Sequence, residues 1–244
     1  MNGRKIVISS AGRGLGRALA ITVAAQGAVS ILLGRSREAL QDACETIKCK
    51  TSASAYAIVC DLSDIKSVVH AANQITETHP DIDILVNNGA HYTSGRFGEQ
   101  TDDQILATVN SIVTGTMTLT RELLPLLRKR PHADIHNVVS MSGLSYARLK
   151  SASLPFRAAK AAQDGFNQGL VEELHGSRIR VTSIYPGLIE DVAPGDPDWP
   201  RKRDLNEGLT NRDVVDAIVY ALSAPSNVSL RSIVIERTCS DFLA

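Results

Sequence analysis

The sequence has few aromatic residues and no excess of either charge. Phe, Trp and Tyr make up 4% of the 244 residues, and Lys plus Arg equals Asp plus Glu at 26 each. No basic or acidic block stands out, so electrostatics give no argument for a nucleic-acid partner. We therefore expect a small-molecule substrate and no nucleic acid.

Cysteine-based sites and long apolar runs are missing as well. The four cysteines, Cys44, Cys49, Cys60 and Cys239, form no Cys-x-x-Cys pair, which indicates neither a metal site nor a disulfide. No apolar run approaches the roughly 18 residues of a membrane helix, and residues 1–4 lead into a strand without a signal-peptide core. We expect a soluble, cytoplasmic protein with no metal and no membrane contact.

What the sequence does contain is a regular alternation of short apolar runs and helix-like segments. The runs predict strands at residues 6–8, 28–33, 55–60, 82–86, 135–139, 179–184 and 232–236. The segments between them predict helices at 37–49, 63–78 (capped by Ser63), 102–130 (kinked or divided by Pro125), 156–175 and 211–223, after a first helix that follows Gly16.

Strands that alternate with helices at this spacing imply right-handed crossovers between parallel strands. We therefore predict an α/β fold, with one doubly wound (Rossmann-type) domain over residues 1–244. Its mostly parallel seven-stranded sheet would carry helices on both faces, and a polar, proline-rich loop at about 188–210 would lie over the substrate.

The stretch from Ser9 to Gly16 is typical of a phosphate-binding turn. It follows the first apolar run and precedes the first helix, and Gly12, Gly14 and Gly16 allow backbone N–H groups to approach a pyrophosphate. The helix that follows would direct its positive dipole end at that charge. The alternative is a glycine-rich loop that only joins a strand to a helix.

The end of the second strand indicates which dinucleotide would bind. Folds that prefer NAD usually place an acidic side chain here, whereas an arginine accommodates a 2′-phosphate. This chain has Gly34-Arg35-Ser36, and Arg13 in the glycine turn could contact the same phosphate. The pattern predicts NADP(H) rather than NAD(H), unless Arg35 is simply an exposed surface residue.

Taken together, these landmarks resemble the short-chain dehydrogenase/reductase family over nearly the whole chain. The family's turn Thr-Gly-x-x-x-Gly-x-Gly falls on residues 9–16, its Asn-Asn-Ala-Gly on 87–90 and its Pro-Gly on 186–187. The resemblance implies cofactor contacts from Ser9, Ser10, Gly12, Arg13, Gly14, Leu15, Gly16, Arg35, Ser36, Asp61, Leu62, Asn88, Gly89, Lys160, Pro186 and Gly187.

The family's catalytic motif, Tyr-x-x-x-Lys, falls on Phe156-Arg157-Ala158-Ala159-Lys160. In the family the tyrosine transfers the proton at the substrate oxygen, the lysine lowers its pKa and holds the nicotinamide ribose, and a serine orients the carbonyl. The resemblance implies a catalytic set of Asn110, Ser140, Phe156 and Lys160. A phenyl ring in place of the phenol cannot transfer a proton.

Other departures from the family pattern lie in the cofactor motifs. Ser10 replaces the first glycine, Gly89-Ala90 inverts the usual Ala-Gly, and Asp191 stands where many members have a threonine that bonds the nicotinamide carboxamide. We expect these changes to weaken cofactor binding without abolishing it.

Other tyrosines could replace the missing phenol. Residues 146–150 also spell Tyr-x-x-x-Lys, but this segment lies in a polar loop with no helix after it, which argues against a catalytic role. Tyr92 and Tyr185 each follow a predicted strand and could project toward the nicotinamide, or could simply line a pocket.

The sequence leaves two functions open. One is an NADP(H)-dependent carbonyl reductase or alcohol dehydrogenase whose proton comes from another group, or whose tyrosine was replaced by design. The other is a redox-silent nucleotide-binding protein or an enzyme of a non-redox step such as cyclisation or isomerisation. Asn110, Ser140 and Lys160 could also have ordinary roles, namely bonding helix backbone, capping a strand end and remaining solvated.

The predicted helix at 156–175 is rich in small residues, which allow helices to approach closely. These residues are Ala158, Ala159, Ala161, Ala162, Gly165 and Gly169. Together with the helix at 102–130 they predict a homodimer or homotetramer, because oligomers normally close by two-fold symmetry.

Overall fold

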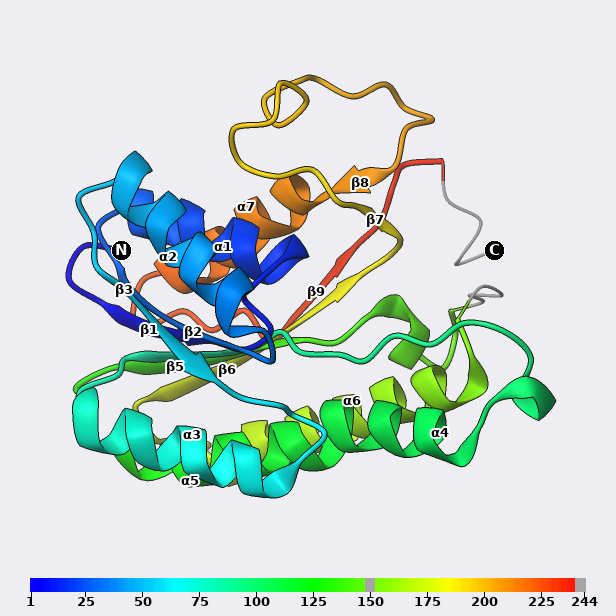
Figure 1. Ribbon diagram of the computed structural model, residues 1–244, viewed down its shortest axis with the longest axis horizontal. Helices are drawn as coiled ribbons and strands as arrows, with labels where there is room; N and C mark the ends of the chain where they lie inside the picture. The colour runs from blue at the N-terminus through cyan, green and yellow to red at the C-terminus, as the bar shows by residue number, and fades with distance from the viewer. Residues whose placement is uncertain (148–151, 240–244) are drawn as a thin grey trace.

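A seven-stranded parallel sheet runs through the molecule, which we describe from a computed structural model of residues 1–147 and 152–239 (Figure 1). The strand order is β3-β2-β1-β4-β5-β6-β9, and every neighbouring pair is parallel. The strands are β1 (Lys5–Ile8), β2 (Val29–Gly34), β3 (Ala55–Val59), β4 (Ile84–Asn87), β5 (Ala133–Val138), β6 (Ile179–Pro186) and β9 (Ser232–Ile235). This confirms the predicted doubly wound α/β fold, whose strand order reverses between β1 and β4.

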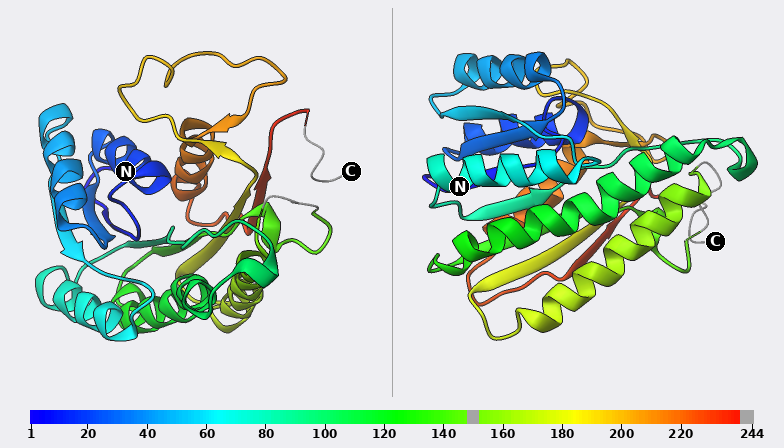
Figure 2. Two further views of the ribbon diagram at one scale, coloured as in Figure 1. Left: turned by 45° about the vertical axis from the view of Figure 1, so that its right-hand side comes forward. Right: turned by 60° about the horizontal axis from the view of Figure 1, so that its bottom comes forward.

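Helices cover both faces of the sheet. They are α1 (Gly14–Ala25), α2 (Arg37–Lys50), α3 (Ile65–Thr78), α4 (Asp102–Val109), α5 (Gly115–Arg128), α6 (Leu154–Glu173) and α7 (Asn211–Ser223). Helices α1, α2 and α7 pack on one face and α3, α5 and α6 on the other (Figures 1 and 2). Alternate residues of one strand feed the two apolar layers: Ile6 and Ile8 enter the first layer and Val7 the second.

The predicted helix at 102–130 is interrupted at Asn110 and not at Pro125. Between α4 and α5 lies a single π-helical turn, Asn110–Thr114, closed by the N–H of Gly115 on the Asn110 carbonyl. Such a turn inserts one extra residue into a helix. Pro125 lies inside α5, where buried leucines on either side hold the helix together despite the missing N–H, so the helix is not divided there.

Another correction concerns the start of α3. Asp64, and not Ser63, caps the helix, because its Oδ1 accepts the N–H of Lys66 at 2.9 Å. The Ser63 hydroxyl instead donates to Asp61 Oδ1 at 2.7 Å.

The predicted substrate loop lies between two short strands, β7 (Ile189–Glu190) and β8 (Leu209–Thr210), which pair in parallel. Two ion pairs stabilise it: Arg201 pairs with Glu207, and Arg203 with Glu190 at 2.7 Å. The loop is the gold segment at the top of Figure 1.

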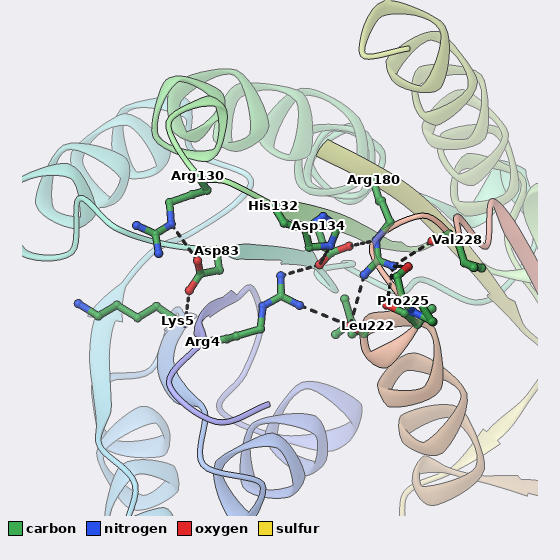
Figure 3. Close-up of polar contacts among 11 residues, drawn as sticks. Arg4, Lys5, Asp83, Arg130, His132, Asp134, Arg180, Leu222, Pro225 and Val228 are labelled. Atoms are coloured by element: carbon green, nitrogen blue, oxygen red, sulfur yellow. Dashed lines mark hydrogen bonds and ion pairs between the residues drawn. The ribbon is translucent and has the colours of Figure 1, made fainter. Parts of the chain in front are cut away.

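The amino end of the sheet is closed by a network of ion pairs (Figure 3). Asp134, whose side chain is 4% exposed, accepts from Arg4 at 2.6 Å and from Arg180 at 2.7 Å. Arg180 also donates to the carbonyls of Ala224 and Val228 just beyond α7, so the network fixes the end of that helix. Among the described residues, no helix combines the length and apolar character needed to cross a membrane.

Candidate active site

A cleft of about 950 Å³ lies beyond the carboxyl ends of the central strands, where the strand order reverses. Its walls come from the glycine turn, the ends of β2 to β6, and the start of α6. The predicted site residues that line it are Ser10, Gly12, Arg13, Gly14, Leu15, Arg35, Ser36, Asp61, Leu62, Asn88, Ser140, Phe156, Lys160, Pro186 and Gly187. Segments far apart in the sequence thus converge on a single site.

The other predicted residues lie behind these walls and shape them. Ser9 is buried, and its Oγ accepts the N–H groups of Asn88 and Gly89 at 2.9 and 3.0 Å, which fastens β1 to the end of β4. A side chain at Gly16 would have its Cβ 2.5 Å from the Ser10 carbonyl oxygen. Asn110 does not reach the cleft, and its backbone carbonyl begins the π-helical turn.

The glycine turn suits a phosphorylated ligand. Gly14, with φ of +56°, opens α1, and among the described residues no side chain caps the N–H groups of this helix. Those donors and the helix dipole therefore remain available to an anion. Arg13 and Arg35, both exposed on the cleft wall, add two cations, and Ser36 adds a hydroxyl. The fit to a dinucleotide that carries an extra phosphate rests on this donor set.

Ser10 is larger than the glycine of the family pattern, and Gly89 is smaller than the alanine of that pattern. Ser10 has φ of +52°, a left-handed conformation that favours glycine, so the serine is strained there. A Cβ added at Gly89 would overlap Leu62 Cδ1 and lie 3.0 Å from Ser10 Oγ. The side chain that position 89 lacks is thus replaced by the hydroxyl of Ser10 and the methyl of Leu62, which explains why the inverted Gly-Ala order fits here.

Phe156 and Lys160 lie one turn apart at the start of α6. The Phe156 ring is 8% exposed, packs on Ile112 and Ala159, and has the Lys160 Nζ 5.8 Å from its centre. Lys160 is 2% exposed, which excludes a solvated role, and its Nζ donates to the Val138 carbonyl at 2.9 Å. Burial lowers the pKa of Lys160 to about 7, because the charged amine is costly in an apolar setting.

Ser140 acts together with a neighbour. Its Oγ accepts the N–H of Ser142 at 3.1 Å, so the residue caps the short helical turn Met141–Gly143 and not the end of the strand. Ser140 also lines the cleft, and the Ser142 hydroxyl donates to its Oγ at 2.9 Å. Because Ser142 supplies that bond, the Ser140 proton is left to be donated into the cleft.

The alternative tyrosines differ in position. Tyr92 lines the cleft and its ring meets Phe156 edge-on, with centroids 5.1 Å apart. Tyr185 is not part of the cleft wall, and its hydroxyl donates to Asp164 at 2.5 Å. Tyr146 is exposed, and Lys150, the other end of its motif, lies outside the described residues.

Sequence reasoning missed several residues of the site. Gln163 accepts a second Lys160 N–H at 2.9 Å, and its spacing of three from Lys160 on one helix could have revealed it. The Ser-x-Ser spacing likewise pointed to Ser142. His91 and Leu188 also line the cleft, but they lie in loops whose side-chain directions no sequence pattern fixes.

Comparisons with known proteins agree with this geometry. A family model described as short chain dehydrogenase matches residues 4–196. The chain belongs to the short chain dehydrogenase family. An uncharacterized oxidoreductase of Staphylococcus saprophyticus is 29% identical over 229 residues, which cover 94% of this chain and 95% of the relative.

Solved structures share the fold at lower identity. L-sorbose reductase from Gluconobacter frateurii, complexed with NADPH and L-sorbose, has a TM-score of 0.85 at 21% identity over 98% of both chains. An alcohol dehydrogenase from Thermococcus sibiricus, complexed with 5-hydroxy-NADP, has a TM-score of 0.84 at 19% identity over 97% of both chains.

Proposed function

We propose that this family member is an NADP(H)-dependent oxidoreductase that acts on a carbonyl or hydroxyl of a small molecule. The observation that carries the proposal is the convergence of the glycine turn, two arginines and the pair Ser140 and Lys160 on one cleft. Solved relatives with the same fold are bound to NADP-type cofactors, which supports the choice of cofactor. When bound, NADPH would supply the hydride.

In this proposal the chain's own residues divide the work. Arg13 and Arg35 hold the 2′-phosphate, the N–H groups at the start of α1 hold the pyrophosphate, and Asp61 contacts the adenine side. Ser140, oriented by Ser142, donates a hydrogen bond to the substrate oxygen. Phe156 positions the substrate by packing and contributes no proton.

The catalytic part is tested by NADPH oxidation against a panel of aldehydes, ketones and quinones, with wild type and Phe156→Tyr. Restoring the phenol beside Lys160 should raise the rate by up to about 10²- to 10⁴-fold, the contribution of a general acid where no other group supplies the proton. Phe97→Tyr is the matched control, because Phe97 is exposed and does not line the cleft. NADPH binding with no reduction by either protein would contradict the proposal.

The cofactor preference is tested by titration with NADPH and NADH. We expect tighter binding of NADPH and a smaller preference in Arg35→Asp, which replaces an attractive charge with a repelling one. Arg37→Asp introduces the same charge change two residues away, at an exposed position outside the cleft wall. Equal loss in both variants would mean that overall charge, and not a contact of Arg35, sets the preference.

We further propose a cytoplasmic homodimer or homotetramer that associates through α6 and the α4–α5 rod. Five small residues of α6 are exposed, namely Ala158, Ala161, Ala162, Gly165 and Gly169, and nothing lies within 4 Å of a Cβ added at either glycine. Light scattering should give a multiple of the 26.2 kDa chain mass, reduced to one chain in Gly165→Arg. A monomeric wild type would contradict this.

A redox-silent nucleotide-binding role is the second candidate. It is favoured by the phenyl ring at the catalytic position and by Tyr185, whose hydroxyl bonds Asp164 and does not enter the cleft. Tight NADPH binding combined with an inert Phe156→Tyr variant would support it.

A further inference from the structure

The buried face of α6 is polar next to the cleft. Lys160, Gln163 and Asn167 follow one another at spacings of three and four, which place them on one helix face, and each is 1–2% exposed. Farther from the cleft the same face continues with Leu170, which joins the apolar core. A polar stripe therefore replaces apolar packing only near Lys160.

The strands beneath α5 and α6 carry two more buried amides. Asn87 and Asn137 are partners in the register of β4 and β5. Leu85 and Ile135, two residues earlier on each strand, lie in the core layer beneath α5 and α6, so both asparagines point into that layer. Asn87 Nδ2 donates to Asn137 Oδ1 at 2.8 Å and to Thr120 Oγ1 of α5 at 3.0 Å, which leaves Asn87 Oδ1 and Asn137 Nδ2 to be satisfied.

These side chains hold several polar atoms that have no partner among the described residues. They are Asn87 Oδ1, Asn137 Nδ2, Gln163 Nε2, Asn167 Nδ2 and Asn167 Oδ1. Buried amide groups nearly always bond to protein or to ordered water. The set contains both donors and acceptors, as a site for internal water requires. The Lys160 ammonium has one N–H beyond the two already donated to Val138 and Gln163, and this N–H is left for the cleft.

We propose that Asn87, Asn137, Gln163 and Asn167 hold internal water beneath Lys160, and that this water resupplies the proton that Lys160 gives to the substrate in place of the missing phenol. Gln163 is a positioning residue that holds the amine between the water and the cleft. The inference rests on the proposed reductase function.

The proposed step balances without a further reagent. The hydride of NADPH joins the carbonyl carbon while one N–H proton of Lys160 passes to the carbonyl oxygen, so the carbonyl is reduced and the cofactor oxidised. The neutral amine then turns about its Cε–Nζ bond and takes a proton from the internal water as that water takes one from solvent, so no hydroxide is left.

The surroundings of Lys160 suit a proton donor. Burial alone lowers its pKa to about 7, and no charged neighbour contributes to this change. On α6 the nearest carboxylate, Asp164, is held by the Tyr185 hydroxyl of β6. On β5 the partner is the neutral Val138 carbonyl. A donor with a pKa near the working pH transfers protons most effectively.

A crystal structure at a resolution that shows water tests the site directly. We expect ordered water bonded to Gln163 Nε2 and to the Asn167 amide. The proposal would be overturned if no ordered water contacts these amides, or if the amides bond to each other. This measurement needs neither a variant nor any activity, so it stays decisive if the protein reduces no carbonyl, a result that would reject only the reductase function and the proton step that rests on it.

The role of Gln163 is tested by NMR titration of the Lys160 amine. Its Oε1 accepts from the ammonium and so favours the charged form; Gln163→Met should therefore lower the pKa of Lys160 by about one unit. In active protein, the loss of reductase rate with rising pH should move down equally. Gln168→Met is the control, because Gln168 is exposed on the same helix. An unchanged pKa in Gln163→Met would overturn the positioning role.

Discussion

The two ends of the parallel sheet treat buried charge in opposite ways. At the amino end, the carboxylate of Asp134 is paired with two guanidinium groups, Arg4 and Arg180, at 2.6 and 2.7 Å (Figure 3). At the carboxyl end, the equally buried amine of Lys160 bonds, among the described residues, to the neutral groups of Val138 and Gln163 alone. The first arrangement fixes charges for stability, and the second keeps an amine close to neutrality, at a cost in stability that a reactive site can require.

Breaking the amino-end network should have the largest effect on stability. Asp134→Asn leaves two guanidinium groups without their counter-charge, and we expect the free energy of unfolding to fall by about 3–5 kcal/mol. Urea denaturation measures this loss, and NADPH affinity should stay unchanged because the cleft is at the other end. In the control Asp81→Asn, which breaks the surface pair with Lys5, the loss should be under about 1 kcal/mol. Equal losses in both variants would remove the contrast.

Removing the amine of Lys160 at the carboxyl end should instead raise the free energy of unfolding near neutral pH. Since the pKa of Lys160 is about 7 in the fold and near 10.5 when unfolded, the unfolded chain binds more protons between these values, so stability rises with pH in that window. Lys160→Met lacks this dependence. Relative to wild type it should therefore gain about 3 kcal/mol in unfolding free energy as pH falls from 10 to 7.

Urea denaturation at several pH values measures that gain. Lys129→Met, at an exposed position, is the matched control. If the two variants show the same pH dependence, the amine of Lys160 is not perturbed by burial.

His136 lies in β5, between the two ends of the sheet, and is a third buried ionisable side chain. It is fully buried, neither ring nitrogen has a partner among the described residues, and burial lowers its pKa to about 4. In the unfolded chain His136 binds a proton near pH 6.5, whereas in the folded protein it stays neutral down to about pH 4. Stability is therefore lost as pH falls from 6.5 toward 4. His136→Leu should remove about 3 kcal/mol of this acid sensitivity in pH-dependent denaturation. The exposed His70→Leu should leave it in place.

The smallest expected effect concerns the cleft wall. Gly89→Ala should destabilise the protein by about 1–3 kcal/mol through overlap with Leu62 and Ser10. In a Ser10→Gly background the cost should fall by about 1 kcal/mol, which a double-mutant cycle measures. Gly98→Ala, which meets nothing within 4 Å, should be nearly neutral. Strict additivity of the two changes would show that Ser10 and Gly89 are not coupled.

Local pattern was enough to predict the sheet, the main helices and the glycine turn, because apolar period and glycine spacing are properties of short segments. Most other cleft residues, such as Asp61 and Ser140, were expected from the family resemblance. The contacts that distinguish the two ends were not predictable in this way. Arg180 and Asp134 are 46 residues apart in the sequence, so nothing in the sequence near either one names its partner. The environment of Lys160 depends on how α6 faces the sheet, and the capping of α3 depended on a choice between Ser63 and Asp64 that propensity does not decide.

The π-helical turn at Asn110–Thr114 fixes the angular relation between two stretches of one rod. In an α-helix each residue turns the chain by about 100°, so the extra residue rotates the whole surface of α4 by that amount relative to α5. Deleting one residue within this turn would keep every other side chain of α4 and α5. It would nevertheless turn Leu106 and its neighbours on α4 to a new direction. Insertions and deletions here therefore change which side chains of α4 face a given direction, while the packing of α5 against the sheet stays as it is.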